Sequence, residues 1–179
     1  MSTRKAAAVM VAALAVSWTA VAAERTAPPA SAGQTTVYVL SDRKTGTEGL
    51  ADKQIQQRNQ VFDWMETDML TLLRKRGGYQ SEVLQSRDAF KPGPGKYLLV
   101  TRIVKYNPGA KAARMFVGFG AGATSLDTHY ELYGEGREPL LSTPHGVGSS
   151  REWMNCCRKL NEQMLEAINA KLGGAPAAK

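Results

Sequence analysis

Ser125, Asp127 and His129 are the residue types of a hydrolase triad, and they alternate with apolar residues over positions 125–133. Such alternation is typical of a half-buried strand, which would direct all three toward solvent. A triad needs the serine and histidine in hydrogen-bond contact, with the acid on the far side of the imidazole. Residues two apart on a strand lie about 6.5–7 Å apart, so Ser125 would not reach His129. We interpret the three residues as a solvated strand face.

A glycine-rich stretch, FVGFGAG, begins at Phe116 and continues with Gly118, Phe119, Gly120 and Gly122. A nucleotide-binding glycine loop follows a strand and opens a helix, whereas the next element predicted here is a strand. Two interpretations stay open. The stretch is either a bulged strand edge or hairpin, where glycine allows close backbone approach, or a loop that exposes its two phenylalanines to a partner or a membrane.

We expect no metal and no cofactor. His129 and His145 fall in different elements, and no pair of Cys or His residues has ligand spacing. Cys156 and Cys157 are adjacent on a predicted helix, where successive side chains point about 100° apart, so we expect no bridge between them. We place Cys157 in the apolar face and Cys156 at its margin, where a second chain could reach it. Cys156 is therefore the candidate for an intermolecular disulfide in a homodimer.

Trp64 is a further candidate contact residue. It points away from the apolar face of the helix predicted over residues 50–76. An exposed tryptophan is a typical interface anchor. The other interpretation is that a loop or the N-terminal leader covers it.

The elements that must position these residues form an α+β pattern. Apolar and β-branched runs predict strands over 35–40, 79–84, 96–106 and 125–133, with a short last strand near 139–143. Helical spacing of apolar residues predicts helices over about 50–76 and from a capping box at 149–152 to the glycines at 173–174. We expect a mostly antiparallel sheet of four to five strands, with two long amphipathic helices packed on one face and the 96–106 strand in the middle.

The first 23 residues have the pattern of a secretory signal peptide. Arg4 and Lys5 precede an apolar run, and Val21-Ala22-Ala23 is a small-residue cleavage site. The run is short and rich in alanine, which disfavours the alternative of an uncleaved membrane anchor. We expect a flexible leader over 24–34, a single domain over 35–173 and a disordered tail over 174–179. The cleavage point has no cysteine to carry a lipid.

The charge is basic without being concentrated. The formal net charge is +7, and loss of residues 1–23 removes two basic residues and no acidic one, leaving +5. This excess favours anionic partners such as phospholipid, lipopolysaccharide or acidic polymers. The basic residues are scattered and lack an interleaved aromatic stripe, and an exported protein does not meet nucleic acid. We expect no nucleic-acid partner.

Three segments resemble one bacterial family. They are the run KYLLV at 96–100, the glycine-rich run at 116–122, and the strand over 126–132 with its closing helix. Together they are similar to the family catalogued as domain of unknown function 4410. The resemblance covers about two-thirds of the chain after residue 23 and implies a fold, with no catalytic residues. It also implies an exported envelope protein, often a lipoprotein, although this chain lacks the lipid-bearing cysteine.

These observations predict a periplasmic or secreted, non-enzymatic interaction module of the cell envelope. We expect it to bind a protein or an anionic envelope component through its sheet edge and its basic surface. The alternatives are an assembly or structural accessory of the envelope and a small periplasmic hydrolase. A cleft containing a histidine or carboxylate with a shifted pKa would favour the hydrolase.

Overall fold

The computed structural model describes residues 34–107, 124–149 and 153–173. The predicted signal peptide, most of the leader, the glycine-rich stretch at 116–122 and the tail lie outside these residues. The described elements are, in chain order, β1 Thr36–Ser41, α1 Asp52–Lys75, β2 Gln80–Val83, the short 3₁₀ helix η1 Arg87–Ala89, β3 Lys96–Asn107, β4 Thr124–Tyr133, β5 Pro139–Ser149 and α3 Trp153–Leu172.

The five strands form one sheet in the order β2-β1-β3-β4-β5. The expected α+β fold and the central place of β3 are confirmed. The sheet is mixed, however, because β1 runs parallel to both β2 and β3, while β3, β4 and β5 are antiparallel neighbours. The parallel pairing of β1 and β2 follows from the helix between them, which carries the chain back to the starting end of the sheet.

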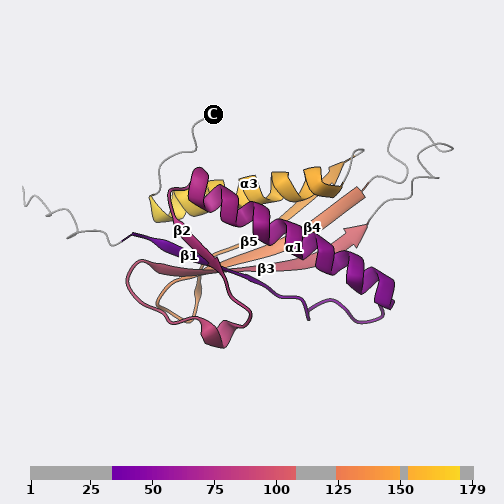
Figure 1. Ribbon diagram of the computed structural model, residues 1–179, viewed down its shortest axis with the longest axis horizontal. Coiled ribbons are helices and arrows are strands. Elements are labelled where there is room, and N and C mark those ends of the chain that lie inside the picture. Colours follow the sequence, from indigo (N-terminus) through magenta and orange to yellow (C-terminus); the bar gives the residue numbers. More distant parts are fainter. Residues whose placement is uncertain (1–33, 108–123, 150–152, 174–179) are drawn as a thin grey trace, which may run out of the picture. The chain divides into compact units, whose positions relative to one another are not determined.

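Both long helices cover the same face of the sheet (Figure 1). α1 packs on β1 and β2, α3 packs on β4 and β5, and the two helices contact each other. Their apolar faces have the predicted helical spacing, and burial of these faces against the strands forms the main core. The most fully enclosed side chains of this core include Phe62, Met69, Leu73, Leu99, Leu126, Tyr130, Leu160 and Met164.

The opposite face of the sheet is covered at one end by the connection between β2 and β3. Since both strands run parallel to β1, the chain between them must return along the sheet, and it does so on the side away from the helices (Figure 1). Leu84 and Phe90 of this connection pack against Leu98, Val100 and Tyr133. The rest of this side, which we call the open face, carries polar side chains of β3, β4 and β5.

The ends of α1 have local causes. At its start, the Gln54 side chain accepts a hydrogen bond from the Ala51 backbone N–H at 2.9 Å. At its end, Gly78 has a φ of +71°, in the left-handed region that other residues rarely adopt. A Cβ on Gly77 would lie 2.5 Å from the Tyr79 ring, so both glycines are needed for the turn into β2. No helix among the described residues is long and apolar enough to cross a membrane.

Candidate functional site

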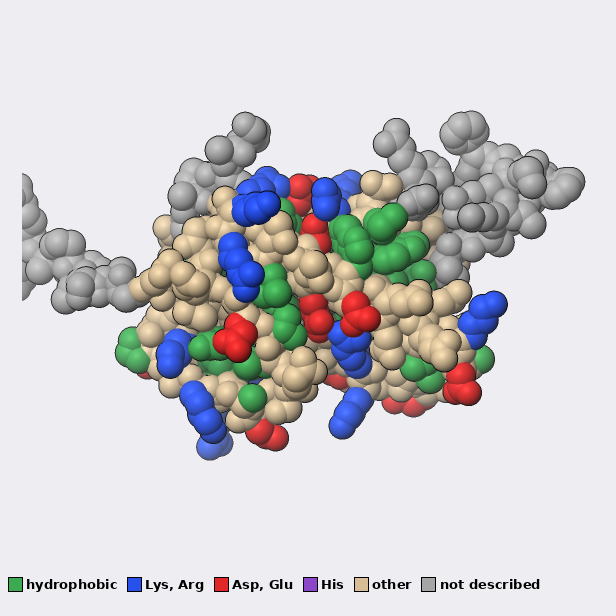
Figure 2. All heavy atoms as spheres, viewed as in Figure 1, with side chains coloured by type: hydrophobic (Ala, Val, Ile, Leu, Met, Phe, Trp, Pro, Cys, Tyr) green, Lys and Arg blue, Asp and Glu red, His purple; other side chains and the backbone are tan. Residues whose placement is uncertain are grey.

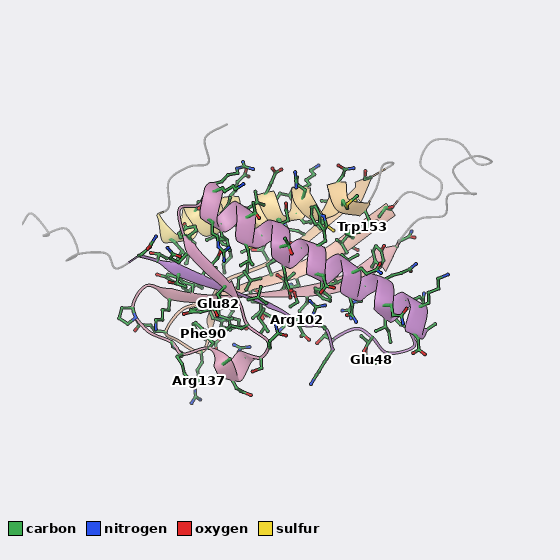
Figure 3. The ribbon with its side chains drawn as sticks, in the orientation of Figure 1. Glu48, Glu82, Phe90, Arg102, Arg137 and Trp153 are labelled. Atoms are coloured by element: carbon green, nitrogen blue, oxygen red, sulfur yellow. The ribbon has the colours of Figure 1, made fainter. Side chains whose placement is uncertain are left out.

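A cluster of charged side chains lies on the open face around Arg102 of β3 (Figure 3). The Nε atom of Arg102 is 3.1 Å from Asp42 Oδ2, and its Nη1 atom is 3.0 Å from Glu131 Oε1. Asp42 also accepts hydrogen bonds from the Thr45 hydroxyl at 2.7 Å and from backbone N–H groups of the following turn. Glu131 accepts another from the Tyr133 hydroxyl at 2.7 Å. We call Asp42, Arg102 and Glu131 the Arg102 cluster.

The Arg102 cluster holds its carboxylates in the ionised form. Burial by itself would raise the pKa of Asp42, but the hydrogen bonds from Thr45 and Arg102 outweigh it and leave that pKa below its usual value. The same balance, with Tyr133 and Arg102 as donors, lowers the pKa of Glu131. A general acid needs a pKa near the working pH, so the geometry suits a structural or binding role better than proton transfer.

The predicted polar strand face is present, but its histidine contacts a different serine. His129 Nε2 lies 3.0 Å from Ser142 Oγ of β5 and 3.7 Å from Glu131 Oε1. A triad would require the acid on the other imidazole nitrogen, and here both groups meet the same one. Ser142 is exposed, and Glu131 is already bound by Arg102 and Tyr133. This arrangement does not activate a nucleophile.

A cavity of about 410 Å³ borders the Arg102 cluster at the end of β1. Four basic and two acidic side chains line it. Two of these four basic side chains are paired, Arg43 with Asp63 and Glu66 and Arg102 within its cluster. The other two have no ion pair with a described residue. They are Lys44 and Arg87; the Arg87 guanidinium lies 4.0 Å from the centre of the Tyr133 ring. On the face in Figure 2, basic and acidic side chains are interspersed, which agrees with a scattered charge.

The two outer strands of the sheet differ in how they are protected. β2 is four residues long and carries the exposed Glu82 (Figure 3). β5 is eleven residues long, has no charged side chain, and is hydrogen-bonded on one side to β4 within the described part of the chain. The predicted last strand is thus longer than expected and continues through His145. Short length and charge are the usual means of protecting an outer strand, and β5 has neither; its two prolines are Pro139 at the first position and Pro144 in the interior.

Trp64 lies half-buried between the two helices. Its ring meets that of Trp153 edge-on, with centroids 6.1 Å apart, and the Arg158 guanidinium lies 5.6 Å from its ring centre. Among the described residues, α3 therefore covers the Trp64 ring. The predicted contact residues Phe116, Gly118, Phe119, Gly120 and Gly122 lie outside the described residues.

Both cysteines are free thiols and both are fully buried. The burial of Cys157 agrees with its expected place in the apolar face. The expected position of Cys156 at the solvent margin is wrong, because its thiol faces the Thr124 carbonyl of β4 at 3.8 Å. The side of α3 that carries Cys156 packs against β4, so the buried face of α3 is wider than its apolar residues alone indicate. Burial raises the pKa of Cys156, and of Cys157 to about 12, which leaves both thiols unreactive.

Two buried charged side chains of α1 escaped the sequence reasoning. Arg58 is 3% exposed and Asp68 is 8% exposed. Asp68 accepts from Arg158 at 2.9 Å and from Asn161 at 3.0 Å, and so joins the two helices. A signal for Arg58 was available, because it precedes Phe62 by four residues on the apolar face.

The comparisons with known proteins identify a family and several solved structures, two of which are described here. The family model described as "Domain of unknown function (DUF4410)" matches residues 50–177, which confirms the resemblance over a longer stretch than the motifs covered. No curated protein matches the chain. Two PelC dodecamer structures from Paraburkholderia phytofirmans, one of them a single-substitution variant, are similar at 12% and 11% identity. They have TM-scores of 0.44 and 0.43, and the alignments cover 85% and 81% of this chain and 94% and 92% of theirs.

Proposed function

The chain belongs to the family described as Domain of unknown function (DUF4410), and we propose that this member is an exported, non-enzymatic interaction module that binds a protein through β5. The partner would add a strand to the outer edge of the sheet. Main-chain hydrogen bonds would supply affinity in this mode, and alternate side chains would supply specificity.

The observation that carries this proposal is the length and neutrality of β5. Residues 140–148 have no charged side chain, and beyond β4 no other described strand pairs with their outer edge, where every residue but Pro144 has a backbone N–H. Leu140 on this strand is 41% exposed, which adds apolar surface for a partner side chain. An uncharged outer strand of this length is prone to pair with another chain, which favours a protein partner.

The proposal that the chain is exported rests on the sequence pattern of its first 23 residues. We expect the mature chain to start at or near Glu24 and to act in the periplasm or outside the cell. N-terminal sequencing of the native protein checks this. Intact Met1 in the membrane fraction would contradict it.

The hydrolase alternative is disfavoured by the site chemistry. The carboxylates of the Arg102 cluster have lowered pKa values, and no acid of the described residues contacts the second nitrogen of the His129 ring beside Ser142. No observation favours an assembly accessory over a binding module.

The test of the β5 proposal is a charge placed on the strand. Gly148 is exposed, has no positive φ, and a Cβ there would meet its nearest atom, the Thr124 carbonyl oxygen, at an ordinary 3.8 Å. Gly148→Lys should therefore fold normally and obstruct strand addition. The matched control is Gly136→Lys in the turn between β4 and β5, where a Cβ meets nothing within 4 Å.

The full-length chain and both variants are used as baits for the native envelope extract. We expect Gly136→Lys to retain the partner and Gly148→Lys to lose at least about tenfold of the binding, with equal melting temperatures. Equal retention by both variants would show that β5 is not the binding edge. Equal loss would show that added charge alone weakens the complex.

A further inference from the structure

A second, smaller cavity lies between the start of α1 and β3, and we call it the Arg58 pocket. Its volume is about 190 Å³, and its polar lining includes Gln54, Gln57, Arg58 and Lys105. Of the described residues that line it, none is acidic. Pockets for whole drug-sized molecules begin at about 300 Å³, so this one fits a single small group.

Arg58 reaches this pocket as a buried cation whose hydrogen-bond acceptors are all neutral. Its Nη2 donates to the Ile103 carbonyl at 2.9 Å and to the Thr45 carbonyl, and its Nη1 donates to the Arg43 carbonyl at 3.3 Å. The guanidinium also lies 5.2 Å from the centre of the Phe62 ring. A guanidinium has five N–H groups, so these three bonds do not use its full donor capacity.

No described carboxylate forms an ion pair with Arg58. The acidic groups that act on it, Asp42 and Glu48, do so at longer range. Asp42 is bound by Arg102, and Glu48 is exposed (Figure 3). Burial lowers the pKa of Arg58 against the raising effect of these two acids. An enclosed cation without a contacting counter-ion is costly, and an anion in the pocket would remove that cost.

The neighbouring groups favour the same kind of ligand. Lys105 adds a second positive charge to the lining. Gln54 and Gln57 lie in the first two turns of α1, at the positive end of the helix dipole. Ile103 and the 66%-exposed Val104 provide an apolar wall.

We infer that the Arg58 pocket binds an anionic oxygen group, a carboxylate or phosphate, through the Arg58 guanidinium and the start of α1. Guanidinium is the side chain best suited to carboxylate and phosphate oxygens, because its planar N–H groups match them in pairs. This site is separate from β5 and does not depend on the proposed function.

The decisive variant is Gln57→Glu, which is nearly isosteric and places a carboxylate beside Arg58. This internal anion should compete with the ligand and supply the missing counter-ion. Gln56→Glu is the matched control, because Gln56 is exposed, adjacent in sequence, and does not line the pocket. The two variants carry the same change in net charge.

The full chain is titrated with inorganic phosphate and with acetate, and the Arg58 side-chain N–H resonance and the melting temperature are followed. We expect saturable shifts in the wild type and in Gln56→Glu, and at least about tenfold weaker binding in Gln57→Glu. We also expect Gln57→Glu to melt higher than Gln56→Glu without added anion. A parallel arm uses phosphatidylglycerol vesicles, with phosphatidylcholine vesicles as the neutral control.

The outcomes distinguish a soluble anion from a lipid headgroup, and both from a pocket that binds no anion. Shifts with free anions assign a soluble ligand, and shifts with phosphatidylglycerol vesicles alone assign a lipid headgroup. An unmoved Arg58 resonance in every arm would overturn the inference and leave Arg58 as a clamp on the 43–47 turn. Equal weakening in both variants would overturn it as well, since it would reflect net charge alone.

Discussion

Arg102 is part of β3 and Arg58 contacts β3 from α1, and the two guanidinium groups have different surroundings. Arg102 lies on the open face between two carboxylates that pair with it directly. Arg58 comes from α1 on the helix-covered side and meets three backbone carbonyls. A cation neutralised within the chain forms a closed cluster. A cation held only by neutral oxygens keeps most of its charge available to a ligand.

The pKa values of the two arginines shift in opposite directions, which expresses this difference. Burial lowers the pKa of each guanidinium. At Arg102 the hydrogen bonds and charges of Glu131 and Asp42 outweigh burial, so the net shift is upward. At Arg58 the distant acids do not outweigh it, so the net shift is downward. Arg102 therefore has balancing carboxylates in direct contact, whereas Arg58 has none among the described residues.

The largest expected effect comes from Arg58→Met. The substitution leaves three carbonyl oxygens without their donor, that of Ile103 buried and those of Arg43 and Thr45 partly buried, and an unsatisfied acceptor of this kind costs about 1 kcal/mol. We expect the free energy of unfolding to fall by about 3 kcal/mol in urea denaturation. Arg58→Lys keeps the charge but donates from a single nitrogen, so its free energy of unfolding should fall by less. A loss below about 1 kcal/mol for Arg58→Met would mean that water already serves these carbonyls.

Arg102→Met should lower the free energy of unfolding by a smaller amount, and that amount should depend on pH. The pKa values of Asp42 and Glu131 in the folded chain lie below the ordinary 3.8 and 4.5. Their stabilising contribution is therefore present above those ordinary values and is lost as the pH falls through the lowered ones. At neutral pH we expect a loss of about 1 kcal/mol, because the partners are only partly buried.

Removal of Arg102 also removes one cause of each lowered pKa, beside Thr45 at Asp42 and Tyr133 at Glu131. The decline of stability on acidification should therefore become shallower in Arg102→Met than in the wild type. Urea midpoints measured between pH 6 and pH 3 give both curves. Parallel curves would show that the backbone and hydroxyl donors alone hold the two carboxylates ionised.

His129→Ala should have the smallest effect. Its contact with Ser142 is solvent-exposed, and its approach to Glu131 is long at 3.7 Å. We expect the free energy of unfolding to change by less than about 0.5 kcal/mol, as is usual for surface substitutions. Urea denaturation of this variant beside Arg102→Met checks the ranking. A larger loss would place His129 inside the Arg102 cluster.

The element boundaries follow from local sequence, whereas the strand partners do not. Alternation located β4 and the double apolar face placed β3 at the centre, because side-chain periodicity records which faces are covered. The parallel pairs of β1 were not anticipated, although a strand, a long helix and a second strand in succession already favour them. β5 was predicted too short because Pro144 and two glycines depress strand propensity, which an outer strand tolerates.

The candidate sites were harder to predict than the fold. The Arg102 cluster joins Asp42, Arg102 and Glu131, whose contacts depend on strand register across the sheet. The Arg58 pocket depends on carbonyl groups, which carry no sequence signal at all. Cys156 was misplaced because the neighbouring β4 strand, and not the helix's own pattern, determines how much of α3 is covered.

The two-sided parallel pairing of β1 also determines when this chain can fold. Thr36 lies beside Gln80 in β2 and beside Lys96 in β3, so these contacts close chain separations of 44 and 60 residues. Contacts this distant form slowly, because the chain loses much entropy before they stabilise it. β1, the first of the described strands to be synthesised, must therefore wait for β3 before it has both neighbours. This delay would keep the proposed export substrate extended while it is threaded through a secretion channel.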